Sequence, residues 1–300
     1  MIRQPTAIDI GLLAALALIW GSAFTAIEVA IAGVSALHLT AARAAIGFAV
    51  LLPFALARRE PVTATVRQFG LIVAIALLNV VIPFWLIASA QATITAGATA
   101  LLMGVGPVLS LIVAHFSSGD DRITVRKVLA VLLGGLGVAL ITLGDVGAQD
   151  EGRVLAIASV VAASACYVAS GALARRIVGV SSIALSTMVL AVSALALLPV
   201  ALLVDGAAVT GTSWDAVMAL VYLGAVPTGL AYLLRYHLIR TVGLSRFSIS
   251  MNLVPVSGLM LGAAVLGEEI TLAMVSALLL VVSSFYLATT TSRAPPPSRT

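Results

Sequence analysis

The sequence is organised as long apolar stretches separated by short segments that carry most of the charged and turn-forming residues. A helix needs about 20 mostly apolar residues to cross the hydrocarbon core of a bilayer. Ten stretches reach this length, and their limits are residues 8–31, 36–57, 69–89, 95–116, 125–143, 154–173, 182–204, 216–238, 243–266 and 272–290. The segments between them are too short to hold a folded soluble domain. We therefore expect an all-α polytopic membrane protein with ten transmembrane helices.

The composition agrees with this reading and excludes several other classes of protein. Hydrophobic residues make up 61% of the 300 residues and charged residues 9%, whereas soluble domains contain about 45–50% apolar and about 25% charged residues. So few charges cannot cover a water-facing surface, which excludes a soluble enzyme and a disordered chain. The single cysteine, Cys166, excludes an internal disulfide and any Cys-based metal site.

The basic residues are distributed unevenly between the two sides of the predicted membrane. With the N-terminus inside, fourteen of the 16 Lys and Arg residues fall in cytoplasmic segments, Arg153 falls outside and Arg43 lies within a span. Cytoplasmic loops of membrane proteins are rich in Lys and Arg. The net charge of +4 therefore needs no nucleic-acid partner. We expect a plasma-membrane protein, in a bacterium the inner membrane, with both termini in the cytoplasm.

Prolines recur at matching places in the two halves of the chain. The pairs are Pro53 and Pro199, Pro83 and Pro227, and Pro107 and Pro255, which are 146, 144 and 148 residues apart. The last pair is followed at equal distance by two similar turns, Gly119-Asp120-Asp121 and Gly267-Glu268-Glu269. This self-similarity predicts an internal duplication, with a first repeat over 1–147, a second over 148–290 and a disordered cytoplasmic tail over 291–300.

Each predicted repeat contains five spans, so the second repeat must enter the membrane from the opposite side. Inverted repeats are typical of secondary transporters, whose substrate site lies near the midplane between the two copies. We therefore expect two inverted five-helix repeats. A duplication without alternating access is the alternative.

Three sequence motifs point to one family of membrane proteins. They are Trp20-Gly21-Ser22-Ala23-Phe24 in the first span, Arg43 in the second, and Pro255 followed by Gly267-Glu268 in the second half. In combination with ten spans they resemble the drug/metabolite transporter superfamily, specifically the EamA-type ten-span exporters. The chain departs from that pattern at Asp120, where Glu is usual, and at Glu28, where a basic residue is common. The resemblance covers residues 8–290 and implies a transporter of amino acids, metabolites or drugs, most often an exporter.

Polar and aromatic side chains at mid-membrane depth are candidates for a substrate site, because they are costly there unless they face a cavity or a partner. The candidates are Trp20, Ser22, Asn79, Trp85, Tyr167 and Asn252. We expect the two amides to hold an amino acid or similar zwitterion, and the aromatic rings to form walls. Three alternatives stay open: Trp85 as an interfacial anchor, Trp20 as a core residue, and the asparagines as hydrogen-bond partners between helices.

Two further sets of residues have predicted roles in the spans. Pro83, Pro107, Pro227 and Pro255 are expected to kink their helices, each freeing a carbonyl group. Glu28 and Arg43 lie near the outer ends of two spans that are joined by a short turn. We therefore predict an ion pair that gates the outer mouth. An Arg43 side chain that extends outward to the lipid headgroups is the alternative.

The predicted function is secondary transport without cofactor or metal. No GxxxxGK[ST] phosphate-binding loop is present, so ATP is not the direct energy source, and no HExxH motif is present either. We expect export of amino acids or related small metabolites by alternating access through a cavity between the repeats. The alternatives are a channel-like facilitator and, less favoured, an intramembrane enzyme.

The predicted partners are a small-molecule substrate and the lipid bilayer. Because no pair of basic residues lies at mid-depth, phosphorylated sugars are disfavoured. Amino acids, hydrophobic cations and similar metabolites are favoured. We expect a monomer, with a dimer as the alternative.

Overall fold

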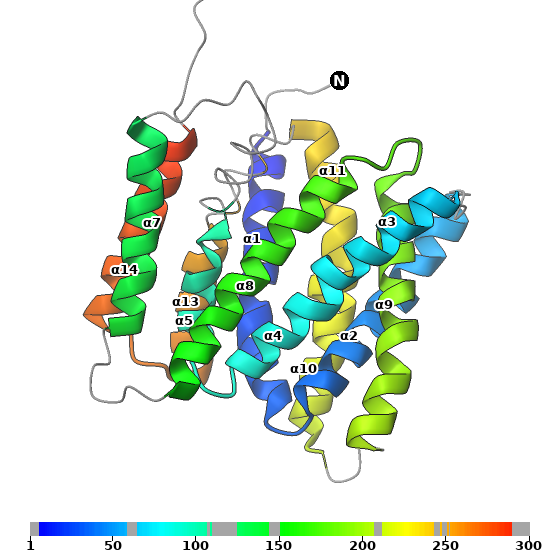
Figure 1. Cartoon of the computed structure of the whole chain (residues 1–300), viewed down its shortest axis with the longest axis horizontal. Coiled ribbons are helices and arrows are strands. Elements are labelled where there is room, and N and C mark those ends of the chain that lie inside the picture. The colour runs from blue at the N-terminus through cyan, green and yellow to red at the C-terminus, as the bar shows by residue number, and fades with distance from the viewer. Residues whose placement is uncertain are drawn as a thin grey trace, which may run out of the picture.

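The computed structural model describes residues 6–58, 65–106, 109, 125–143, 151–206, 212–242, 247, 251 and 253–289. Its elements are α1 (Ala7–Ile31), α2 (Ala36–Ala57), α3 (Val66–Ala76), η1 (Leu77–Val81), α4 (Ile82–Ala90), α5 (Ala96–Met103), α7 (Val125–Leu143), α8 (Glu151–Ala174), α9 (Ser182–Asp205), α10 (Trp214–Leu223), η2 (Gly224–Leu230), α11 (Ala231–Val242), α13 (Leu253–Leu266) and α14 (Leu272–Thr289). The prediction of an all-α protein is confirmed over these residues, and the helices form one bundle (Figure 1).

Hydroxyl side chains set the start of many of these helices. The Thr6 hydroxyl accepts the backbone N–H of Asp9 at the start of α1, and Ser35, Ser181 and Ser213 cap α2, α9 and α10 in the same way. Such caps pair backbone donors that have no partner within the helix. The capping residues thus mark the start of each helix, directly before its apolar run.

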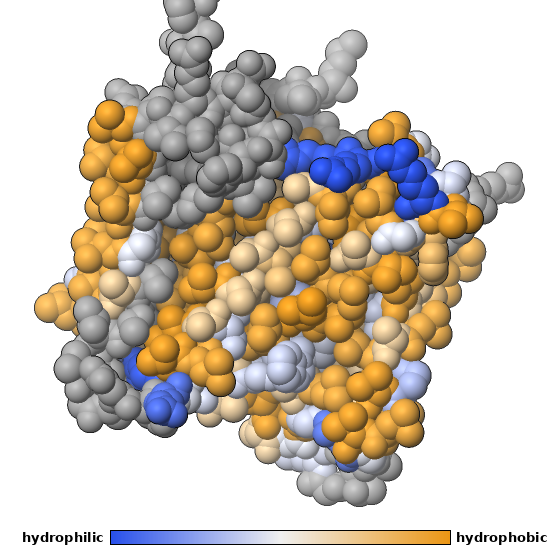
Figure 2. Space-filling view, in the orientation of Figure 1, coloured by the Kyte–Doolittle hydropathy of each residue, from blue (hydrophilic) through white to orange (hydrophobic). Residues whose placement is uncertain are grey.

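The described helices have the length and surface of membrane spans. Six of them are long and apolar enough to cross a bilayer, and Leu253–Leu266 and Leu272–Ser284 are shorter apolar helices. Hydrophobic residues dominate the face in Figure 2, and hydrophilic ones gather near its two ends. On α9, Leu195 and Leu203 are 75% and 85% exposed, as expected for side chains that face lipid. The chain is a polytopic membrane protein, and the count of ten spans stays a prediction.

Helix contacts between the two halves follow a reciprocal pattern. Helix α2 packs against α9, and α7 packs against α14. Helix α1 packs against α10 and α13, whereas α8 packs against α4 and α5. In this comparison α1 corresponds to α8, the span of α3, η1 and α4 corresponds to the span of α10, η2 and α11, and α5 corresponds to α13. The contacts of α1 with the second half then match the contacts of α8 with the first half.

The turns between helices meet in the same reciprocal way. The turn after α1 contacts the connection between α9 and α10, where the Thr212 hydroxyl donates to the Gly33 carbonyl at 3.1 Å. The turn after α8 contacts the start of α3, where Gln68 Nε2 donates to the Val178 carbonyl at 3.1 Å. In Figure 1, α1 begins at the end of the bundle near the N-terminus label, and α8 begins at the opposite end.

One span in each half is interrupted by a π-helical segment next to a proline. Pro83 is the second residue of α4, directly after η1, and Pro227 lies within η2. Proline has no backbone N–H, so the carbonyl four residues earlier loses its helical partner. At η2 the Thr228 hydroxyl donates to that carbonyl, of Leu223, at 2.8 Å. The interruption places polar groups of η1 and η2 inside the bundle.

Candidate functional site

Six polar side chains from both halves meet inside the bundle, and we call them the central polar cluster. They are Arg43 of α2, Asn79 of η1, Tyr167 and Ser170 of α8, Thr228 of η2 and Tyr232 of α11. Ser170 and Thr228 are 2% and 0% exposed. Because polar groups at this depth need partners, the bonds within the cluster show which of its members are satisfied.

Arg43 is the charged member of the cluster and is only 7% exposed. Its Nε donates to Thr228 Oγ1 at 2.7 Å, and its guanidinium carbon lies 3.8 Å from the centroid of the Phe84 ring. Tyr167 and Tyr232 are its nearest electrostatic partners. The hydrogen bond and the cation–π contact fix the plane of the guanidinium group.

Close packing of α2 against η2 brings Arg43 to Thr228. A Cβ atom on Gly47 would lie 2.7 Å from Thr228 Cγ2, and one on Gly224 would lie 2.5 Å from Ile46 Cβ. Neither glycine position has room for a larger residue at the present separation of the two helices. The glycines therefore set the distance at which the Arg43–Thr228 bond forms.

Asn79 connects helices of the two halves. Its Nδ2 donates to the Tyr232 hydroxyl at 3.1 Å, and its Oδ1 accepts from Ser170 Oγ at 3.2 Å. Ser170 Oγ also lies 2.8 Å from the Tyr167 carbonyl. Asn79 is therefore part of a network between helices, which is one of the two roles considered for it from the sequence.

Trp20 and Ser22 lie on α1 and also make contacts with the second half. Trp20 Nε1 donates to the Pro227 carbonyl at 3.1 Å, and its ring meets Phe247 edge-on with centroids 6.3 Å apart. Ser22 Oγ and the Tyr222 hydroxyl are 2.6 Å apart. The indole N–H of Trp20 thus pairs the carbonyl of Pro227 itself, next to the Leu223 carbonyl that Thr228 pairs.

Trp85 lies away from the central polar cluster. Its side chain is 45% exposed and lines a groove of about 630 Å³ between α2, α4 and α9. The groove is almost entirely apolar, and Ser35 and Asp205 lie at its edge. The structure therefore does not bring Trp85 together with Trp20 and Tyr167 as walls of one site.

The predicted ion pair between Glu28 and Arg43 is not formed in this structure. Glu28 Oε2 accepts the Ala96 N–H at 2.8 Å, whereas Arg43 donates to Thr228. The two side chains point to different helices because Glu28 lies on the face of α1 next to α5, and Arg43 on the face of α2 next to η2. A short connecting turn alone did not decide which face each residue occupies.

Glu28 shares the start of α5 with a second carboxylate, that of Glu268. Glu268 Oε1 accepts the same Ala96 N–H at 2.8 Å, and Oε2 accepts the Gly97 N–H at 2.9 Å. A Cβ on Gly97 or Gly262 would lie 2.7 or 2.6 Å from Glu268 Oε2, so these glycines leave room for the carboxylate. The positive end of the α5 dipole stabilises both acidic groups.

Further polar contacts join helix connections at the same end of the bundle, which we call the Glu28 end. The Ser35 hydroxyl donates to the Asp205 carboxylate, and His38 Nδ1 lies 3.3 Å from the same carboxylate. The Thr212–Gly33 bond described above belongs to this end as well. These contacts join α1, α2, α9 and α10 where their ends meet.

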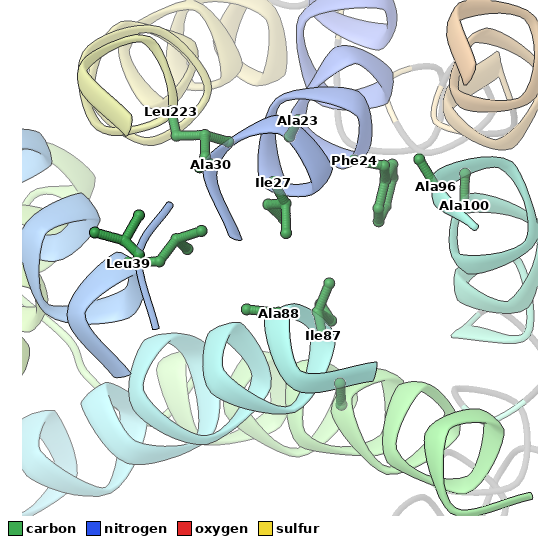
Figure 3. Close-up of a cluster of buried hydrophobic side chains, with 12 residues drawn as sticks. Ala23, Phe24, Ile27, Ala30, Leu39, Ile87, Ala88, Ala96, Ala100 and Leu223 are labelled. Carbon is green, nitrogen blue, oxygen red and sulfur yellow. The ribbon is translucent and has the colours of Figure 1, made fainter. Parts of the chain in front are cut away.

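Apolar side chains separate the central polar cluster from the Glu28 end, and we call them the apolar layer. They are Ile27, Leu39, Ala88, Ala163 and Leu223, all at most 1% exposed (Figure 3). Leu39 precedes Arg43 by one helical turn, and Ala163 precedes Tyr167 by one turn. These buried apolar side chains therefore lie one helical turn from Arg43 and Tyr167, on the side of the cluster that faces the Glu28 end.

Most of the remaining candidates from the sequence lie outside the described residues. Pro107, Asn252 and the tail 291–300 lie outside the described residues, and Pro255 is buried in α13. The sequence pattern did not identify Thr228 and Phe84 as partners of Arg43. For Thr228, its position directly after a span proline was the one usable signal. Among the described residues, no group of three or more His, Cys, Asp or Glu side chains is placed to hold a metal ion.

A bundle of apolar helices with a polar cluster enclosed between its halves defines the class of membrane transport proteins. Residues 8–143 and 154–290 each match the EamA-like transporter family. The chain therefore belongs to the EamA-like transporter family and is a membrane transporter.

Two relatives agree with this assignment, and one solved structure has a similar fold. An "Uncharacterized transporter" of Archaeoglobus fulgidus is 25% identical over 265 residues, which cover 86% of this chain and 90% of that protein. The "Uncharacterized transporter YdfC" of Bacillus subtilis is 24% identical over 256 residues, covering 85% of this chain and 82% of that protein. A crystal structure of a protein with 20% identity superposes with a TM-score of 0.67, over 95% of this chain and 98% of the other. The last comparison concerns the fold alone.

Proposed function

We propose that the protein is a secondary transporter that exports amino acids or related small metabolites by alternating access between two inverted five-helix repeats. One observation carries the proposal: the central polar cluster is assembled from both halves and has the apolar layer on the side that faces the Glu28 end. A substrate bound in the cluster is released to that end only when Leu39, Leu223 and their neighbours separate.

The reciprocal helix contacts support the inverted arrangement. Helix α1 packs against the span formed by α10, η2 and α11, and α8 packs against the span formed by α3, η1 and α4. Likewise α1 packs against α13, and α8 against α5. The two sets of contacts interchange when the two halves are exchanged. Two such halves can adopt a second conformation, in which the bundle is open at the end that was closed and closed at the end that was open. This exchange is the physical basis of alternating access in the proposal.

The transport activity is tested by counterflow in proteoliposomes. Vesicles loaded with a high concentration of one unlabelled amino acid are expected to take up the same labelled amino acid faster than empty vesicles, with saturation. A channel-like facilitator instead gives ion currents or fluxes that neither saturate nor respond to substrate on the far side. Failure to observe stimulated, saturable uptake for any amino acid would contradict the proposal.

The predicted orientation has a separate test, in a Cys166→Ser background that leaves no native thiol. Ala32→Cys lies in the turn after α1, and Val178→Cys in the turn after α8. If the protein lies in a bacterial inner membrane with both termini in the cytoplasm, an impermeant thiol reagent should label the Ala32→Cys variant from outside the cell. It should label the Val178→Cys variant from the cytoplasmic side. Labelling of both from one face would refute the inverted repeats.

A further inference from the structure

We infer that Arg43 is the anchor for the carboxylate of the transported solute, so that the site selects monocarboxylates and zwitterions over amines. The inference rests on the proposed function, because it names the substrate class of the central polar cluster. It differs from the expectation that Arg43 pairs with Glu28 as a gate. It also narrows the sequence-based substrate range, which included hydrophobic cations.

The first argument is that the Arg43 charge is not neutralised within the described part of the chain. Its contacts there are the neutral Thr228 hydroxyl and the Phe84 ring, and its electrostatic partners are two tyrosines. Burial of an unpaired charge is strongly unfavourable, and an uncompensated charge inside a membrane protein points to a functional role.

The carboxylates of the described residues are engaged elsewhere or lie at the surface. Asp9 caps α1, Asp205 binds Ser35, and Glu28 and Glu268 bind the start of α5. Glu151, Asp215 and Glu269 are exposed. A negative charge for Arg43 therefore has to come from a solute, if the described residues alone are considered.

The second argument is that the bonding capacity of the guanidinium group is largely unused. Arginine has five N–H donors, and only the one on Nε has a partner among the described residues. The terminal nitrogens are not among the fully enclosed side-chain atoms that lack a partner. They therefore keep a small accessible surface on a side chain that is 7% exposed overall. Two parallel N–H donors match the geometry of one carboxylate.

The third argument is the chemistry of the surrounding groups. Besides Arg43, the cluster consists of neutral hydroxyl and amide groups, with the Phe84 ring on one side. The cluster thus has one positive charge and no negative charge, which repels amines and attracts anions. A single guanidinium group suits one carboxylate, whereas a doubly charged phosphate ester would need a second basic group.

The inference is tested by counterflow with four related probes. The probes are phenylalanine, 3-phenylpropionate, phenylalaninamide and phenylethylamine, which share a ring but differ in charge. Wild-type protein is expected to transport the two carboxylates at least about tenfold more efficiently than the amide and the amine, because only the carboxylates form charge-assisted hydrogen bonds with Arg43. This comparison needs no variant.

The variants then assign the selectivity to Arg43. Arg43→Gln is expected to lower carboxylate counterflow about tenfold or more, and Arg43→Lys is expected to recover only part of it, because lysine has no planar fork. Arg58→Gln removes a charge from the exposed end of the same helix and should leave selectivity unchanged. Size-exclusion profiles and circular dichroism confirm that each variant is folded.

The possible outcomes are distinct. Equal transport of phenylethylamine and phenylalanine by wild type, or carboxylate counterflow by Arg43→Gln within twofold of wild type, would overturn the role of Arg43 while leaving a transporter. Folded wild-type protein that shows counterflow of none of the four probes, and of no other amino acid, would overturn the proposed function itself.

Discussion

The acidic side chains at the Glu28 end and the basic side chain of the central polar cluster have opposite surroundings. At the Glu28 end, Glu28 and Glu268 accept backbone N–H groups at the start of α5, so the helix dipole offsets part of their charge. In the central polar cluster, Arg43 has a hydroxyl and an aromatic ring but no carboxylate among the described residues. We propose that the first arrangement stabilises the fold and that the second binds the solute. Variants at the two places should therefore separate stability from transport.

The largest effect on stability is expected for Glu268→Ala. The change removes the acceptor of the Gly97 N–H and one acceptor of the Ala96 N–H, which costs about 3 kcal/mol for bonds to a charged group. Thermal unfolding in detergent measures the loss. Glu269→Ala is the matched control, because that neighbour is exposed. Equal unfolding temperatures for Glu268→Ala and the control would show that the carboxylate does not stabilise α5.

The next largest effect is expected for Thr228→Val. This nearly isosteric change removes the acceptor for Arg43 Nε and the donor to the Leu223 carbonyl, at a cost of about 2 kcal/mol. It also frees Arg43 to rotate, so the KM for a carboxylate probe should rise. Thr228→Ser keeps the hydroxyl and should restore both properties. A threonine that matters only for packing would instead give the opposite order, with valine better than serine.

A smaller effect is expected for Trp20→Phe. The variant keeps an aromatic ring next to Phe247 but has no donor for the Pro227 carbonyl, which costs about 1 kcal/mol. The unfolding temperature should fall by a few degrees. Trp214→Phe is the control, because Trp214 is 72% exposed. If the two variants unfold at the same temperature, the Trp20–Pro227 bond contributes nothing measurable.

The smallest effect on stability is expected for Arg43→Met. Removal of an unpaired buried charge is favourable, and loss of the Thr228 bond and the Phe84 contact is unfavourable, so the unfolding free energy should change by less than about 1 kcal/mol. Carboxylate transport should nevertheless be lost. A drop in stability as large as that of Glu268→Ala would mean that Arg43 holds the fold together, and the contrast between the two regions would disappear.

The helices of this fold follow from local sequence, but their partners do not. Apolar runs and the caps at Thr6, Ser35 and Ser181 define where helices begin. The spacing of prolines located η1 and η2 in advance, although not their π-helical form. The family model matches two segments, 8–143 and 154–290, and the division into repeats over 1–147 and 148–290 stays a prediction.

The central polar cluster was only partly predictable. Asn79 and Tyr167 were identified because polar and aromatic groups are rare at this depth. The contacts Trp20–Pro227 and Arg43–Thr228 join residues 207 and 185 positions apart, and no local pattern specifies such pairings. The different partners of Glu28 and Arg43 in this structure have the same origin, since nearness in the chain does not fix which neighbouring helix a side chain faces.

The most direct test of the account is the accessibility of the apolar layer during transport. In the Cys166→Ser background, Leu39→Cys places a thiol in that layer, where the native side chain is 0% exposed. We expect an impermeant reagent to label this thiol slowly from the Glu28 side. A transported carboxylate should change the labelling rate. In a variant that also carries Arg43→Gln, the carboxylate should no longer change the rate. A thiol that is never labelled from that side, or is labelled at one rate with and without substrate, would contradict alternating access through the cluster.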